Sequence, residues 1–356
     1  MKIDAYPHFC PKEFIDAFSK RVVSSNKFGG GDQRSLNPMV WDVNLRLEIM
    51  DRYEDYAQIL TPTGPQVETF CSSEDAVYLA KIFNDAMAEL VNKYPDKFVA
   101  AVAYLPLNDI DATLKEIDRT INELGFKGIL IHTPTLKIKG SIEQGFDYEN
   151  VRSIDIPEYM PIYESMSKHN LPIWLHPRGL GAVPVYSGEE RGKYMLYHIF
   201  GWPIESALAM GRLVYGGTLA KYPNLRFIIH HCGSGIVPIL GGRIDWAFDF
   251  FRCFSKTLNK GQAGAEDLFA LKRPIDYFKM FYADTAISGY TAGLMCGHDF
   301  FGAEHIIFGT DYPYYDPELG SQSIKKTSDS VNRMNISDAD KQKIFEGNIK
   351  RILHLP

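Results

Sequence analysis

The sequence predicts a (β/α)8 TIM barrel, formed by a single domain over residues 1–356, with loop insertions at the C-terminal face. Two observations predict this fold. Eight short apolar, β-rich runs alternate with helix-like stretches, and most of these runs are continuously apolar, as expected of buried parallel strands. In addition, His and Asp residues stand at or just past the C-terminal ends of several runs, and they can meet only if the strands are parallel and close on themselves. An open doubly wound sheet is the alternative, but no GxGxxG or GxxxxGK[ST] turn follows any run.

The expected strands are spread over the whole chain, and most of the expected helices end near proline or glycine. The strands are predicted at Lys2–Tyr6, Ala57–Pro62, Phe98–Tyr104, Gly128–His132, Pro172–His176, Phe227–His231, Met280–Asp284 and His305–Phe308. The helices are predicted at Ser73–Lys93, Asp111–Leu124, Ile156–His169, Ile204–Lys221 and Ser337–Leu353.

Two segments do not fit this alternation. Val22–Asp42 is polar and rich in glycine, and Pro134–Asp155 is a long stretch that follows the fourth expected strand. Long loops at the C-terminal face of a barrel often cover an active site or mediate contacts. A surface insertion without such a role is the alternative, and the sequence leaves both open.

The composition limits the class of protein. The net charge is −6 without a basic run, so nucleic acid is not expected as a partner. No apolar run is long enough to span a membrane, and the sequence starts with a strand-like run rather than a signal-peptide pattern. The five cysteines are widely spaced and form no CxxC pair, which is typical of reduced thiols. We therefore expect a cytoplasmic protein.

The first and fifth expected strands end in residues that can bind metal or substrate. On an extended chain Tyr6 and His8 point the same way, so both can reach one metal ion. His176 follows an apolar strand and lies at the expected rim of the barrel. Arg178 is placed to hold a substrate carboxylate as a bidentate fork, with a structural ion pair as the alternative.

The later strands supply further candidates. Neighbouring side chains on a strand point to opposite sides, so only one of His230 and His231 is expected to face the interior. Asp311 follows the eighth strand, where a carboxylate can bind metal and move a proton. Asp284 is a second carboxylate at the same rim, or a loop cap, and His132 ends the fourth strand.

At these residues the chain resembles the amidohydrolase superfamily, and within it the group around 2-amino-3-carboxymuconate-6-semialdehyde decarboxylase. The similar stretches are MKIDAYPHFCPK, LPIWLHPRG, GWPIESALAMGRLVYGG, IIHHCG with GGRI after it, YADTA and IIFGTDYP. The resemblance implies that His8, His176 and Asp311 bind metal, and that Asp311 and His231 are catalytic. His231 is preferred because the family has a Gly two residues after this His, whereas the spacing to Pro238 keeps His230 possible.

The chain departs from the family pattern at two positions. Tyr6 stands where the first His of an HxH motif is expected, and His132 lies where binuclear members have a bridging lysine carbamate or carboxylate. Six potential metal ligands result: Tyr6, His8, His132, His176, His231 and Asp311. The expected cofactor is therefore a divalent or trivalent metal, zinc in a mononuclear site, or iron, manganese or both in a dinuclear site with a phenolate ligand.

The resemblance implies a metal-dependent enzyme that acts on a small carboxylic acid, as a non-oxidative decarboxylase or as a hydrolase. The same residues would serve both reactions. The alternative is a dinuclear iron or iron–manganese oxygenase on the same barrel, with Tyr6 and His132 as additional ligands. A catalytically inactive structural barrel is a further reading. We expect a homodimer or a hetero-oligomer with a paralogous subunit. The aromatic stretch Trp246–Phe254 is either an interface or a core helix, and most of it is expected to lie in the core.

Overall fold

The computed structural model describes residues 1–21, 38–136, 151–178, 188, 192–258, 272–314 and 320–356. Its parallel strands form two arcs. The first has the order β1 (Lys2–Asp4), β3 (Tyr56–Pro62), β4 (Phe98–Ala101), with the short β2 (His8–Phe9) also paired to β3. The second has the order β5 (Ile129–Thr133), β8 (Ile173–Pro177), β9 (Phe227–Ile229), β10 (Tyr282–Asp284), β11 (Ile306–Ile307).

Backbone hydrogen bonds connect the two arcs on both sides. Ala103, just past β4, forms a parallel bridge with Ile129 at the start of β5. On the other side the Ala5 amide, just past β1, donates to the Phe308 carbonyl at 2.8 Å. Eight strands therefore follow one another around a ring in chain order, which is the predicted (β/α)8 arrangement.

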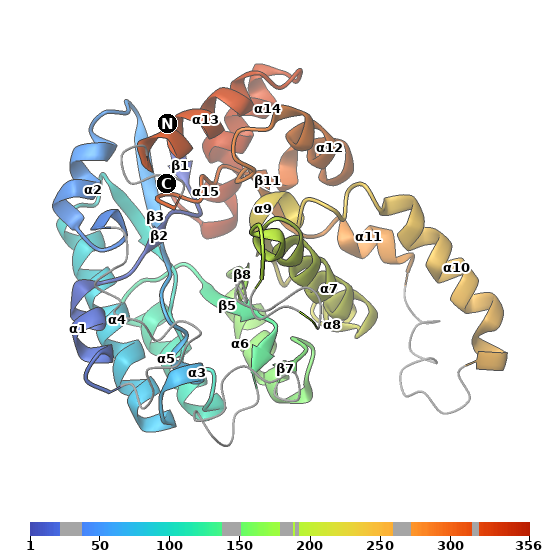
Figure 1. Cartoon of the computed structure of the whole chain (residues 1–356), viewed down its shortest axis with the longest axis horizontal. Helices are drawn as coiled ribbons and strands as arrows, with labels where there is room; N and C mark the ends of the chain where they lie inside the picture. The colour runs from blue at the N-terminus through green and yellow to red at the C-terminus, as the bar shows by residue number, and fades with distance from the viewer. Residues whose placement is uncertain (22–37, 137–150, 179–187, 189–191, 259–271, 315–319) are drawn as a thin grey trace.

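The helices surround this ring of strands (Figure 1). The structure has α1 (Lys12–Phe18), α2 (Val43–Met50), α3 (Val67–Phe70), α4 (Ser73–Lys93), α5 (Ile110–Asn122), α6 (Met160–His169), α7 (Trp202–Tyr215), α8 (Thr218–Lys221), α9 (His230–Gly233), α10 (Gly241–Leu258), α11 (Pro274–Phe278), α12 (Thr291–Phe301), α13 (Gly320–Asn332), α14 (Asp338–Gln342) and α15 (Asn348–Leu353). Their ends follow local chemistry. The Ser72 side chain accepts from the Asp75 amide at the start of α4, and the helix ends before Tyr94 and Pro95.

The interior of the ring and the layer between strands and helices are both apolar. Ile3, Ile59, Leu130, Trp174 and Ile228 belong to one buried cluster contributed by five different strands. A larger buried cluster combines residues of the strands with those of the surrounding helices. The polar candidates described below therefore sit at the ends of strands that a packed core holds in place.

Parts of the two segments outside the alternation are structured. Pro38–Val40 forms a 3-10 turn, and Asp42 then caps α2 by accepting from the Asn44 and Leu45 amides. In the second segment β6 (Thr135–Leu136) pairs antiparallel with β7 (Val151–Arg152). The remainder, 22–37 and 137–150, lies outside the described residues.

The expectation of a mostly buried aromatic stretch at Trp246–Phe254 is wrong for two of its members. Phe248 is buried, but Trp246 is 58% exposed and Phe250 is 39% exposed. The side chains of Phe251 and Phe254 lie outside the described part of the structure. Figure 1 shows the reason, because α10 lies at the outer edge of the molecule, away from the strands. No helix in the described ranges is both long and apolar enough to cross a membrane.

Candidate metal centre

Four side chains from different parts of the chain converge where the strands end. His8 lies on β2, His176 on β8, His230 directly after β9, and Asp311 follows β11. The Nε2 atoms of His8 and His230 lie 3.0 Å and 3.2 Å from the same oxygen of Asp311, Oδ1. One ring nitrogen each of His8, His176 and His230 lies within 4.8 Å of the others. Imidazole and carboxylate groups at this spacing are the usual protein ligands of a transition metal.

Backbone and carboxylate acceptors fix the orientation of three of the rings. His176 Nδ1 lies 2.5 Å from the Pro177 carbonyl oxygen, and His231 Nδ1 lies 3.1 Å from the Ala286 carbonyl oxygen. His230 Nδ1 pairs with Asp284. Because these acceptors need a proton on Nδ1, each Nε2 is the atom turned to the centre, as in metal-binding histidines with an oriented ring.

The buried ring nitrogens test whether the centre fits a metal. His8 Nε2, His230 Nε2 and His231 Nε2 are buried, yet none makes a well-aligned hydrogen bond with a described residue. Buried polar atoms in native proteins are nearly always satisfied. An ion bound among these nitrogens and Asp311 would satisfy them, so the residues present fit a metal.

The pKa values of the histidines at the centre are shifted in opposite directions. Burial lowers the pKa of His8 and of His176 below the ordinary histidine value, which favours neutral, metal-binding rings. Burial also acts to lower the pKa of His230, but the carboxylates of Asp284 and Asp311 outweigh it and raise that pKa to about 9. Burial acts to raise the pKa of Asp311, and His230 and His8 nevertheless hold it well below its ordinary value.

The expectation that only one of His230 and His231 faces the interior is wrong. The strand ends at Ile229, two residues earlier than predicted, and His231 and Cys232 have φ values of 58° and 56°. These left-handed residues interrupt the side-to-side alternation of a strand. Both rings consequently reach the centre, with their centroids 4.0 Å apart. Nothing in the sequence indicates positive φ at these positions, because glycine follows only at 233.

Asp284 fulfils both roles considered for it. Its Oδ1 accepts hydrogen bonds from the Cys232 and Ala286 amides, each at 3.0 Å, which is the loop cap. Its Oδ2 pairs with His230. One carboxylate thus holds both the turn after β9 and the ring that this turn carries.

Tyr6 is buried beside the centre but is not placed as a phenolate ligand. Its hydroxyl donates to the Leu175 carbonyl oxygen at 2.9 Å, and its ring stacks on His230 with a centroid distance of 3.8 Å. Burial, together with Asp284 and Asp311, raises the pKa of Tyr6 well above its ordinary value. A neutral phenol whose proton is already donated is a poor metal ligand. The dinuclear oxygenase alternative therefore loses one of its two supporting observations.

Replacing Tyr6 by Phe is expected to leave metal binding intact. The substitution removes one hydrogen bond, so the free energy of unfolding should fall by about 1 kcal/mol. Elemental analysis of the purified variant should give the same metal content per chain as the wild type. Loss of the metal in Tyr6→Phe would contradict this placement. Loss in this variant of an absorption band that the wild type shows would contradict it as well.

His132 lies beside the centre rather than within it. It is buried, and its ring centroid is 5.5 Å from that of His176. Burial and the Arg178 charge hold its pKa well below the ordinary value. In the described part of the chain, His132 belongs to neither of the groups of side chains whose ligand atoms lie within 4.8 Å of one another. The second supporting observation for a dinuclear site is therefore also absent.

Arg178 forms the structural ion pair that was the alternative to a substrate fork. Its Nη2 lies 2.7 Å from Glu68 Oε1, and both side chains are buried. Its other donors reach the Thr69 hydroxyl at 2.8 Å and the Pro134 carbonyl oxygen at 2.7 Å. With these partners the guanidinium joins α3 to the end of β5.

Replacing Arg178 by Met is expected to destabilise the protein by about 3–5 kcal/mol, because it leaves the Glu68 carboxylate buried without its partner. Urea unfolding followed by circular dichroism measures this loss. The double variant Arg178→Met with Glu68→Gln is the matched control and should recover most of it. A single variant as stable as the wild type would show that the pair contributes little.

The structure also places an aromatic residue at the centre that the sequence did not single out. Trp202, the first residue of α7, has its ring centroid 5.9 Å from that of His176 and 5.9 Å from that of His231. His198 packs on its ring at 4.1 Å. The only sequence signal for Trp202 is the GWPIES stretch. It is similar to the family but does not indicate that Trp202 lies beside the centre.

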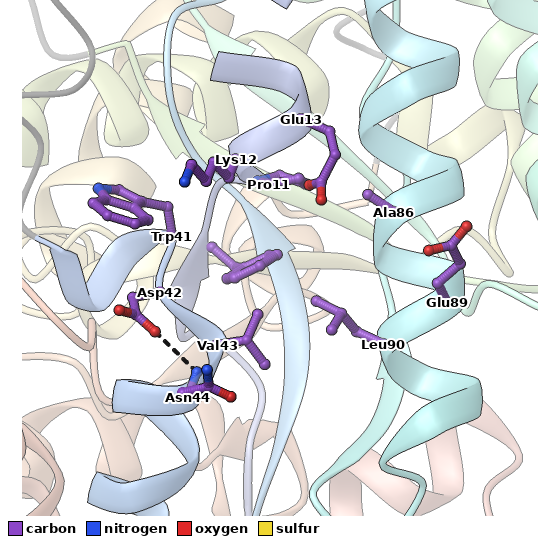
Figure 2. Close-up of a pocket in the computed structure, with 11 residues that line it drawn as sticks. Pro11, Lys12, Glu13, Trp41, Asp42, Val43, Asn44, Ala86, Glu89 and Leu90 are labelled. Atoms are coloured by element: carbon purple, nitrogen blue, oxygen red, sulfur yellow. Dashed lines mark hydrogen bonds between the residues drawn. The ribbon is translucent and has the colours of Figure 1, made fainter. Parts of the chain in front are cut away.

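A separate hollow of about 340 Å³ lies on the outside of the molecule between α1, α2 and α4. Figure 2 shows Trp41, Lys12 and Glu89 around it, with Asp42 capping α2. None of the candidate metal ligands lines it, so it is not part of the centre.

The family is decided by a match over almost the whole chain. The sequence profile described as amidohydrolase matches residues 3–355. The chain belongs to the amidohydrolase family.

Proteins of named activity and solved structures are similar to this chain over nearly its whole length. Gamma-resorcylate decarboxylase of Rhizobium sp. (strain MTP-10005) is 29% identical over 95% of this chain and 96% of its own. The 2-amino-3-carboxymuconate-6-semialdehyde decarboxylase of Dictyostelium discoideum is 25% identical over 100% of this chain and 92% of its own. A dihydroxybenzoic acid decarboxylase from Polaromonas sp. JS666, solved with manganese and the inhibitor 2-nitroresorcinol, is 26% identical, with a TM-score of 0.73 over 99% of this chain and 97% of its own.

These matches confirm the family resemblance and the barrel fold. They also confirm the predicted class, since the relatives are amidohydrolase-fold decarboxylases that act on small carboxylic acids, and one of them holds manganese. They give no support to the oxygenase alternative.

Proposed function

We propose that this protein is a metal-dependent decarboxylase that removes carbon dioxide from a small hydroxylated aromatic acid. The observation that carries the proposal is the convergence of two close groups of ligand atoms at the strand ends, His8 with His176 and His230, and His230 with His231 and Asp311. The Nε2 atoms of His8 and His230 both lie near one Asp311 oxygen. The substrates named for the Rhizobium and Polaromonas relatives support the hydroxylated aromatic class. Hydrolysis would use the same residues, but none of these relatives favours it.

A single metal ion is proposed, held by His8, His176 and Asp311. Two imidazoles and one carboxylate suit zinc or manganese, and they leave further positions open for substrate oxygens. The bound ion would supply positive charge that stabilises the carboxylate and a neighbouring oxygen of the acid as the reaction proceeds. The manganese of the Polaromonas relative supports manganese as the first metal to test.

The proton for the reaction is assigned to His230 and Asp311. His230 lies between two carboxylates, with Nδ1 paired to Asp284 and Nε2 at 3.2 Å from Asp311 Oδ1. The ring carbon that bears the carboxylate accepts a proton from this pair. The carbon–carbon bond then breaks, its electron pair stays with the ring, and carbon dioxide leaves. The proposed role of His231 is to bind the substrate or to assist the proton transfer, and the orientation of its ring by the Ala286 carbonyl supports this role.

The proposal is tested with 2,6-dihydroxybenzoate and related 2-hydroxybenzoates as substrates of manganese-loaded protein. Equal amounts of carbon dioxide and the corresponding phenol should appear, and neither should appear without metal. Release of no carbon dioxide from any of these acids would contradict the proposal.

An oligomer is also proposed, in the form of a homodimer. The exposed aromatic side chains Trp246 and Phe250 on α10 support an interface there, since large exposed apolar groups often mark contact surfaces. Cytoplasmic localisation stays a prediction.

A further inference from the structure

Trp202 stands at the edge of the metal centre, on the first turn of α7. Its ring meets that of His176 edge to face, at an interplanar angle of 65°, and lies nearly parallel to that of His231, at 22°. His231 and His176 are both oriented by backbone carbonyls, so Trp202 borders rings that are themselves fixed. It therefore lies directly beside two rings of the centre, one of which, His176, is a proposed metal ligand.

Among the residues that the structure describes, none accepts a hydrogen bond from the indole N–H of Trp202. Its Nε1 is buried and makes no hydrogen bond with any residue that the structure describes. Indole nitrogen can only donate, and a buried donor without an acceptor is both rare and costly in native proteins. The nearby ring nitrogens His176 Nδ1 and His231 Nδ1 already face carbonyl oxygens and are not acceptors for it. The missing acceptor is accordingly expected on a bound molecule.

We infer that Trp202 is a substrate-binding residue that determines specificity: its ring packs against the ring of the aromatic acid, and its N–H donates to an oxygen of that acid. This inference rests on the proposed function. Aromatic rings associate favourably in edge-to-face or offset arrangements, which a tryptophan ring provides. A phenolic oxygen is an acceptor that the substrate class carries and that decarboxylation leaves in place.

Two consequences follow for the reaction. A hydrogen bond to an oxygen that does not react contributes equally to the bound substrate and to the transition state, so its loss should raise KM and leave kcat nearly unchanged. An acid without an oxygen at the facing position would leave the N–H unsatisfied, and a site with such a donor discriminates strongly against that acid.

The experiment compares Trp202→Phe with the wild type, both loaded with manganese. Phe keeps an aromatic ring at this position and removes the N–H donor. The Kd for 2-nitroresorcinol and the KM for 2,6-dihydroxybenzoate should rise about tenfold or more, as expected for one hydrogen bond to a charged or strongly polar oxygen. The kcat should stay within about threefold of the wild type, as expected for uniform binding. Metal content and the circular dichroism spectrum should not change.

Trp41→Phe is the matched control, because Trp41 lines the outer hollow, which contains none of the candidate metal ligands, and the variant should leave both constants unchanged. Trp202→Leu is a second variant, which should weaken binding further by removing the aromatic ring. Turnover by the wild type together with wild-type Kd and KM in Trp202→Phe would overturn this inference alone. A wild type that neither binds 2-nitroresorcinol nor releases carbon dioxide would overturn the proposed function, and the inference with it.

Discussion

Replacement of Asp311 by Asn is expected to lower kcat for decarboxylation by at least about 10³-fold. Positioned proton transfer alone is commonly worth about 10²–10⁴-fold, and metal polarisation adds to this. Asp311 serves both, because its Oδ1 faces His8 Nε2 at 3.0 Å and His230 Nε2 at 3.2 Å. An amide of the same shape carries no negative charge, binds metal weakly and cannot take up the proton.

The measurement is the rate of carbon dioxide release, together with metal content and unfolding temperature, so that a folding defect is recognised. Asp329→Asn is the matched control, because Asp329 pairs with Lys325 on the outer surface of α13 and should leave the rate unchanged. A rate for Asp311→Asn within about tenfold of the wild-type rate would exclude a role of Asp311 in proton transfer, because positioned proton transfer is commonly worth about 10²–10⁴-fold.

Removal of the metal is expected to abolish decarboxylation, and addition of Mn²⁺ should restore it. Without an ion, the Nε2 atoms of His8, His230 and His231 face one another and Asp311 without aligned hydrogen bonds, and no positive charge stabilises the reacting acid. Treatment with a chelator followed by desalting gives the metal-free enzyme. Activity is then measured before and after the addition of Mn²⁺ or Zn²⁺.

His176→Ala should remain inactive after Mn²⁺ is returned, because it lacks one of the three proposed ligands. His169→Ala is its control, since His169 lies at the end of α6 and belongs to none of the close ligand groups in the described ranges. Full activity of a metal-free wild type would contradict the assignment of the centre.

The fold could be predicted from the sequence because the pattern of the strands is local. The predicted helix Ser73–Lys93 has the same bounds in the structure, and the strand predicted at Pro172–His176 is displaced by one residue, to Ile173–Pro177. The positions of His8, His176 and Asp311 followed from the same pattern, since each stands at the end of an apolar run. Residues at strand ends meet in a barrel whatever their distance in sequence.

What each side chain does at the centre could not be predicted in the same way. The Tyr6 hydroxyl is taken by the Leu175 carbonyl, and the Arg178 guanidinium by Glu68, and both partners are far away in the sequence. His231 reaches the centre beside His230 only because His231 and Cys232 are left-handed, a conformation for which the residue types give no signal. These features depend on tertiary packing, which periodicity does not encode.

The most direct test of a metal-dependent, non-oxidative decarboxylase is carbon dioxide release from 2,6-dihydroxybenzoate and related 2-hydroxybenzoates by manganese-loaded protein in the absence of oxygen. The account predicts equal amounts of carbon dioxide and the corresponding phenol from at least one of these acids, at the same rate with and without oxygen. A product that forms only when oxygen is present, or no carbon dioxide from any of the acids, would contradict it.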